Sequence, residues 1–161
     1  MVKDPRIETT QDQFDNQYNL VTAIEKELVD IHQSVIRLRK VRDQVDDLTK
    51  RAAQPEVEAA GKDLSKKLTE MEDILIQKKT VDGQTVINFP VKLNHHYAHL
   101  RSTVDGPEGP PTAGSRQRLA DLNKQWTGHK ADLAKLLGDN LKSFNQLVRQ
   151  KEVQPVVLPP Q

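Results

Sequence analysis

The sequence predicts an all-α protein, an elongated antiparallel bundle of three arms whose middle arm is made of two helices joined by a loop. Three observations lead to this prediction. Apolar residues recur every three or four positions over long stretches, and no glycine or proline interrupts the longest of them. Only 35% of the 161 residues are hydrophobic and 29% are charged, which is typical of helices largely exposed to water. Disorder also fits this composition, but a disordered chain needs no periodicity.

The first arm is predicted from the stretch 14–52, as one amphipathic helix that runs to about Ala53. Its apolar positions follow three- and four-residue steps, with one seven-residue step: Val21, Ile24, Leu28, Ile31, Val35, Leu38, Val45 and Ala52. Thr9 or Thr10 is the expected N-cap, and Gln13 would complete a capping box with Thr10. Residues 1–8 are expected to form an extended lead-in to a bundle domain over 9–152.

Charged residues of this helix are expected to face solvent. Arg42 takes a position that the apolar repeat assigns to the core, so its stem should be buried and its charged head should reach water. The basic run also includes Arg37, Arg39 and Lys40. Asp43, Asp46 and Asp47 follow this run at spacings that allow ion pairs along one helix. This predicts a solvated face whose charges pair with one another.

The middle arm begins with a second helix that starts at Pro55 and runs to about Lys79, antiparallel to the first. Its apolar face is Val57, Ala60, Leu64, Leu68, Met71 and Leu75. Residues 80–90 break the pattern and are expected to form an ordered loop. The β-branched Thr85, Val86 and Ile87 disfavour a helix there, and Ile87 and Phe89 are expected to pack on the bundle.

A short helix over about 91–104 completes the middle arm, with Leu93, Tyr97, Leu100 and Val104 as its buried face. The glycines and prolines of 105–111 predict a linker. The last helix is expected over about 112–151, with Trp126 in the core and a kink or break at 138–140, where Asp139 or Asn140 would cap a fresh turn. The proline-rich tail, 153–161, is expected to be extended.

Helix lengths favour three arms. The first and last helices are about 40 and 38 residues long, and the two middle helices, of about 24 and 14, together rise to about the same length. A compact four-helix bundle is the alternative. It would leave half of each long helix without a partner.

Composition narrows the classes of function. The net charge of +1 argues against a nucleic acid or an anionic membrane as partner. The absence of cysteine excludes disulfides and thiolate metal sites, and leaves the compartment open. No apolar run reaches the ~20 residues that a membrane span needs.

One cluster has the residue types of a metal site, His95-His96-Tyr97-Ala98-His99. His95 and His99 are four residues apart on a helix, so they are the candidate metal ligands. The segment has no acidic residue and no HExxH pattern, and both histidines fall off the apolar face. The sequence therefore favours a polar helix face and predicts no metal, cofactor or catalytic residue.

The other ionisable residues are expected to be structural. His32 and His129 are isolated, with His129 partly buried and hydrogen-bonded. The carboxylate pairs and triplets are expected on solvent-facing surfaces rather than as acid–base pairs: Glu25 and Glu27; Asp46 and Asp47; Glu70, Glu72 and Asp73.

Four stretches resemble one known family: Val2-Lys3-Asp4-Pro5-Arg6, Ile36 to Arg42, Asn88 to Asn94 and Asn140 to Asn145. They are similar to the helical C-terminal module of large bacterial sortilin-like (BNR-repeat) β-propeller proteins. The resemblance implies an exported protein, periplasmic or extracellular. Proteins of this kind are often labelled glycosyl hydrolases, but that chemistry would belong to the propeller, so the resemblance carries no site residue onto this chain.

The sequence therefore favours a non-enzymatic structural or interaction module, whose partner is an adjacent domain of the same polypeptide or another protein. A self-associating coiled-coil domain is the first alternative. An enzyme or metal-binding protein that uses the histidine cluster is the second.

Overall fold

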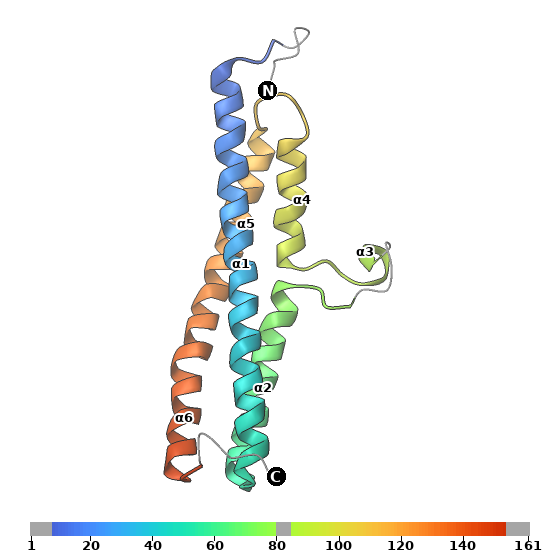
Figure 1. Cartoon of the computed structure of the whole chain (residues 1–161). Helices are drawn as coiled ribbons and strands as arrows, with labels where there is room; N and C mark the ends of the chain where they lie inside the picture. The colour runs from blue at the N-terminus through green and yellow to red at the C-terminus, as the bar shows by residue number, and fades with distance from the viewer. Residues whose placement is uncertain (1–7, 80–84, 154–161) are drawn as a thin grey trace, which may run out of the picture. The chain divides into compact units, whose positions relative to one another are not determined.

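The computed structural model describes residues 8–79 and 85–153, and every regular element in these ranges is helical. This confirms the all-α prediction. The elements, shown in Figure 1, are α1 (Gln11–Ala52), α2 (Pro55–Leu75), α3 (Thr85–Asn88), α4 (Leu93–Asp105), α5 (Ala113–Lys135), a π-helical turn η1 (Leu136–Asn140) and α6 (Leu141–Gln150).

The chain forms two compact units, one of Met1–Gln33 with Leu75–Gly128 and one of Ser34–Ile74 with His129–Gln161. The helices α1 and α5 contribute to both. In the first unit α4 is the third packed helix, and in the second unit α2 takes that role beside α1 and α6. Each unit is therefore built around packed helices, as expected for a helical bundle.

The start of α1 confirms the capping box. The Thr10 main-chain N–H donates to Gln13 Oε1 at 2.9 Å, and the Gln13 N–H donates to Thr10 Oγ1 at 3.3 Å. Thr9, the other predicted N-cap, instead donates its hydroxyl to the Glu108 carbonyl at 2.9 Å. It therefore ties the start of α1 to the loop that follows α4.

Polar contacts in the first unit connect α1 to α4. Gln17 is buried, and its Nε2 donates to the carbonyls of Val104 and Pro107, both at 2.6 Å. The Val104 carbonyl lies in the last turn of α4, where main-chain acceptors lack helical partners, and the Pro107 carbonyl lies in the loop that follows the helix. Further along, Arg101 pairs with Glu25 at 2.8 Å. Residue numbers rise on α1 as they fall on α4, so the two helices are antiparallel.

α5 is joined to both of these helices. Tyr97 is fully buried, and its hydroxyl donates to Asn123 Oδ1 at 2.9 Å. Trp126, also fully buried as predicted, donates its indole N–H to Asp30 Oδ2 at 3.1 Å. The predicted apolar face of α4 is buried at all four positions. The first unit is thus a three-helix core with satisfied polar groups at its edges.

In the second unit α1 and α2 pack as an antiparallel pair. The predicted faces are buried at most positions: Val35, Leu38, Val45, Val57, Leu64, Leu68 and Met71. Pro55 begins α2 as predicted. The end of α6 closes on the start of α2, because Lys151 pairs with Glu56 and its carbonyl accepts from Gln54 Nε2 at 3.0 Å.

The region after α2 differs from the prediction. α2 ends at Leu75 rather than near Lys79, because Gln77 Oε1 accepts the Lys79 N–H at 3.0 Å and this local bond replaces a helical one. A single helical turn, α3, lies where a loop was expected. The helix preferences of β-branched residues differ from others by only a few tenths of a kcal/mol, too little to exclude one turn.

The two apolar residues expected to pack there behave differently. Ile87 is 79% exposed, so the prediction that it packs on the bundle is wrong. Phe89 is half-buried, with the Lys79 ammonium 5.4 Å from its ring centroid. Of the predicted lead-in and tail, residues 1–7 and 154–161 lie outside the described residues.

The predicted interruption near Gly138 takes the form of the π turn η1. Asn140 makes no side-chain capping bond, so a fresh cap at this point was the wrong mechanism. The main chain continues from α5 to α6 instead. Glycine in a helix interior weakens the regular pattern, which helps to explain why the wider turn forms here.

Candidate functional site

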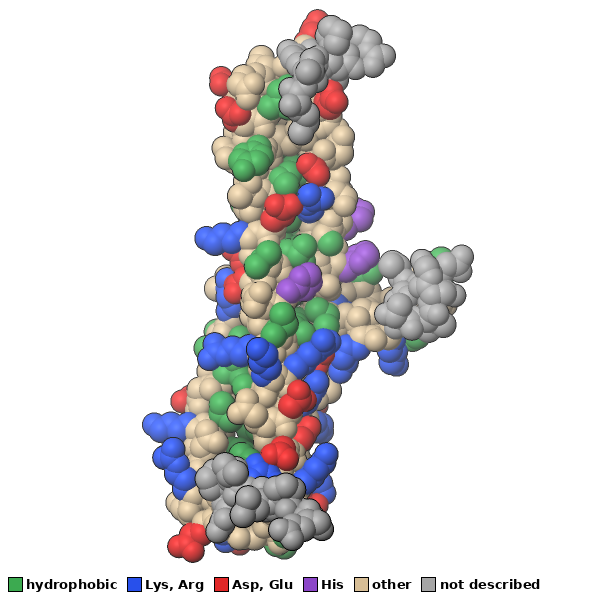
Figure 2. All heavy atoms as spheres, viewed as in Figure 1, with side chains coloured by type: hydrophobic (Ala, Val, Ile, Leu, Met, Phe, Trp, Pro, Cys, Tyr) green, Lys and Arg blue, Asp and Glu red, His purple; other side chains and the backbone are tan. Residues whose placement is uncertain are grey.

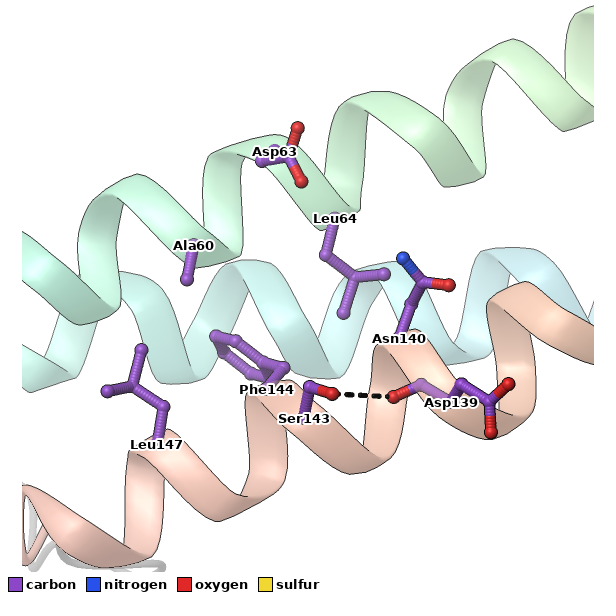
Figure 3. A pocket seen from close by; sticks show the side chains of 8 residues that line it. All are labelled: Ala60, Asp63, Leu64, Asp139, Asn140, Ser143, Phe144 and Leu147. Atoms are coloured by element: carbon purple, nitrogen blue, oxygen red, sulfur yellow. Dashed lines mark hydrogen bonds between the residues drawn. The ribbon is translucent and has the colours of Figure 1, made fainter.

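A pocket of about 350 Å³ lies between α2 and the η1–α6 segment, within the second unit (Figure 3). Its apolar lining is Ala60, Leu64, Phe144 and Leu147, and these side chains reach into the space between the two helices. Leu64 and Phe144 are also core residues, with only 3% and 4% of their surface exposed. The floor of the pocket is therefore the outer edge of the hydrophobic core.

Polar residues form the rim of this pocket: Asp63, Asp139, Asn140 and Ser143. The Ser143 hydroxyl donates to the Asp139 carbonyl at 2.9 Å, the bond drawn in Figure 3. Asp63 accepts from Lys67, one turn further along α2, at 2.6 Å. Because the serine hydroxyl donates to a carbonyl rather than to a base, the arrangement suits binding better than nucleophilic chemistry.

The π turn supplies two of the rim residues, Asp139 and Asn140. A π turn widens the helix locally and is often found at functional sites. The sequence signal was present in Gly138-Asp139-Asn140, which indicated an irregular turn. It did not indicate a pocket, because the other wall belongs to α2.

A buried carboxylate is the main electrostatic feature of the second unit. Glu72 on α2 is 1% exposed, and two arginines of α1 bind its two oxygens: Arg39 at 2.8 Å and Arg42 at 2.5 Å. Burial raises the pKa of the Glu72 carboxyl. The hydrogen bonds and charges of both arginines outweigh burial and hold the pKa below its ordinary value.

This cluster corrects three predictions. Glu72 was expected to face solvent, and the head of Arg42 was expected to reach water rather than a buried partner. Arg39 also pairs across to α2 instead of within a face of α1. A signal existed, since Leu68, Glu72 and Leu75 are spaced four and three apart, which places Glu72 on the apolar face of its own helix.

The predicted histidine candidates lie on α4 in the first unit. His95 is half-buried and His99 is exposed, while His96 between them is half-buried. Burial lowers the pKa of His96, and the charges of Arg118, His95 and His99 lower it further. In the described part of the chain no three histidine or acidic side chains gather as they would around a metal ion.

Of the other polar residues considered in the sequence, some form ion pairs and others are exposed to solvent. Glu25 is half-buried and pairs with Arg101, while Asp47 pairs with Arg51 on its own helix. His32 is exposed, and His129 is half-buried as expected. None of these residues lines the pocket beside the π turn.

No protein-family model, no curated protein and no solved structure matches this chain. None of the helices in the described ranges is both long and apolar enough to cross a membrane.

Proposed function

We propose that this chain is a non-enzymatic helical module for structure or interaction, which braces an adjacent domain of the same polypeptide or binds another protein. The observation that carries the proposal is the groove between α2 and α6. Its floor is apolar, and among its lining residues the one hydroxyl donates to a main-chain carbonyl. A groove between two helices is a common place for apolar side chains of a protein partner to insert.

The contacts of the buried polar groups support the same proposal. Glu72, Gln17 and Trp126 each connect one helix to another. A catalytic acid or base must reach a substrate, whereas these groups are occupied in holding the bundle together. Their arrangement favours a rigid scaffold.

The resemblance of four stretches to the C-terminal module of sortilin-like β-propeller proteins extends the proposal. On this basis the chain is the helical part of a larger exported protein. Its partner would then be the propeller of the same polypeptide.

The gene sequence upstream of Val2 tests that extension, because strand–turn repeats are expected there. The bracing role is tested by producing the upstream segment with and without this chain and comparing thermal unfolding. The upstream segment is expected to melt at a higher temperature when the chain is attached, since each buries surface of the other. Absence of repeats would remove the propeller extension, and an unchanged melting temperature would remove the bracing role.

Self-association is the second candidate, favoured by the exposed apolar side chains of α1. Tyr18 and Val29 are 71% and 57% exposed. They are eleven residues apart, about three helical turns, and therefore lie on one face. Figure 2 shows hydrophobic side chains scattered among charged ones on the visible face of the molecule.

Light scattering over a range of concentrations tests this candidate. Self-association through this face predicts a mass that rises with concentration and falls to the monomer in Val29→Glu. Asn19→Glu, about 100° round the helix from Tyr18, is the matched control and should leave the mass unchanged. A monomer mass at every concentration would remove the candidate.

A further inference from the structure

We infer that the groove between α2 and α6 binds a basic segment of a protein partner, with an apolar side chain in the pocket and a neighbouring lysine or arginine at its rim. This inference rests on the proposed interaction function and names the chemistry of the partner. Three features of the protein support it: the shape of the groove, the charge of its rim, and a second hollow lined by residues of η1 and α6.

The size and floor of the groove fit an aliphatic or aromatic side chain. A pocket of about 350 Å³ lined by Ala60, Leu64, Phe144 and Leu147 offers an inserted side chain contact on several sides. Figure 3 shows these four residues pointing into the gap from both helices. Burial of an apolar side chain there would remove further apolar surface from water.

The rim selects positive charge. Asp63 and Asp139 flank the apolar floor on opposite helices, and no lysine or arginine is among the lining residues. Asp63 already accepts from Lys67, but the side chains of this pair are 61% and 44% exposed. An exposed pair of this kind exchanges partners at little cost, so an incoming cation can compete with Lys67.

A second hollow, also lined by residues of η1 and α6, carries positive rather than negative charge. It measures about 270 Å³ and is lined by Leu137, Gly138, Leu141, Lys142, Asn145, Gln146 and Arg149. Its apolar residues are similar in kind, but its charged residues are both basic. A cationic partner is therefore directed to the α2–α6 groove and away from this hollow.

Titration of the full isotope-labelled chain with a short amphipathic peptide of leucine and lysine, followed by NMR, tests the inference. A peptide with glutamate in place of lysine is the matched probe. The lysine peptide is expected to shift amide signals of residues 60–64 and 139–147. Its affinity should fall as salt is raised, because the rim contacts are solvent-exposed ion pairs.

Two variants complete the test. The double substitution Asp63→Asn with Asp139→Asn is expected to weaken binding about fivefold, from the loss of two exposed charge pairs. Asp43→Asn with Asp132→Asn removes two exposed aspartates outside the groove and should leave affinity unchanged.

Equal binding of the glutamate peptide, or shifts confined to other residues, would overturn the inference even if the variants failed to fold. Unchanged affinity in a folded Asp63/Asp139 variant would do the same. The thermal comparison with the upstream segment uses no peptide. It can therefore succeed where the peptide fails, which separates the bracing role from the basic partner.

Discussion

Gly61 of α2 lies directly against Thr49 of α1. A Cβ atom built on Gly61 would come within 1.8 Å of Thr49 Oγ1, far inside any real contact. The hydroxyl cannot turn away freely, since it donates to the Val45 carbonyl at 2.6 Å. The two helices pack this closely because one of them carries no side chain at the crossing.

The substitution Gly61→Ala is therefore expected to destabilise the protein, by about 1–3 kcal/mol in urea unfolding. The loss should appear although alanine favours a helix by about 1 kcal/mol over glycine. Thr49→Ala combined with Gly61→Ala should recover part of the loss, because it removes the clashing hydroxyl but leaves the Thr49 Cβ at 3.0 Å from the added Cβ. A Gly61→Ala variant as stable as the parent protein would show that the helices do not approach this closely.

Glu72→Gln is expected to cost about 2–3 kcal/mol, below the usual range for breaking a buried pair, because Arg39 and Arg42 retain some access to solvent. Glu70→Gln is the matched control two residues away. Its side chain is 61% exposed and 3.9 Å from Lys66, so the change should be under about 0.5 kcal/mol. Equal effects of the two substitutions would contradict a buried carboxylate at position 72.

The same carboxyl predicts acid sensitivity. Its pKa in the folded protein lies below the ordinary value of 4.5, so the unfolded chain takes up a proton first as the pH falls. The stabilisation is present above pH 4.5 and is lost as the pH drops through the lower folded pKa. Unfolding free energies measured from pH 6 downward should fall more steeply for the parent protein than for Glu72→Gln.

His96 predicts a second pH effect at higher pH. The pKa of His96 in the folded protein is lowered from 6.5, so the unfolded chain binds a proton first as the pH falls below 6.5. The contribution of His96 to stability is therefore full above pH 6.5 and is lost as the pH falls through the lower folded pKa. His96→Gln should flatten the dependence of unfolding free energy on pH between about 7 and 5. Equal slopes in the parent protein and in His96→Gln would contradict the lowered pKa of His96.

Two helix ends offer stabilising substitutions. Ala53 and Glu152 have φ of 49° and 52°, in the left-handed region. At the end of α6 the bonds from Glu152 N–H to Arg149 O and from Val153 N–H to Val148 O form a Schellman motif, which favours glycine at Glu152. Ala53→Gly and Glu152→Gly should each add about 0.5–1 kcal/mol. Ala52→Gly, inside α1, should instead lose stability; a loss in all three would contradict these backbone conformations.

Helix positions and buried faces were largely predictable from local pattern. Thr10 and Gln13 identified the start of α1, and Leu93, Tyr97, Leu100 and Val104 identified the buried face of α4. Capping and periodicity act between residues at most a few positions apart, so one helix contains the whole signal. Leu28 and Ala52 are the exceptions on α1, because both are half-buried although they follow the repeat. Their predicted role in the core is correspondingly reduced.

The candidate site was harder to predict from local sequence pattern. Gly138, Asp139 and Asn140 indicated an irregular turn, but the pocket also needs Ala60, Asp63 and Leu64 from α2. These residues are about eighty positions away in the chain. Local spacing on one helix does not state which residue of another helix lies opposite.

By itself, the sequence determined that the chain is helical, where its longer helices begin and end to within a few residues, and which apolar side chains form most of the core. These follow from short-range backbone preferences and from the cost of leaving apolar surface in water. Only the tertiary structure decided that Glu72 is buried between two arginines, that Thr49 packs directly against the backbone of Gly61, and that a groove lies beside the π turn. Each of these depends on which residues of two helices come into contact, and the apolar periodicity of one helix does not determine that.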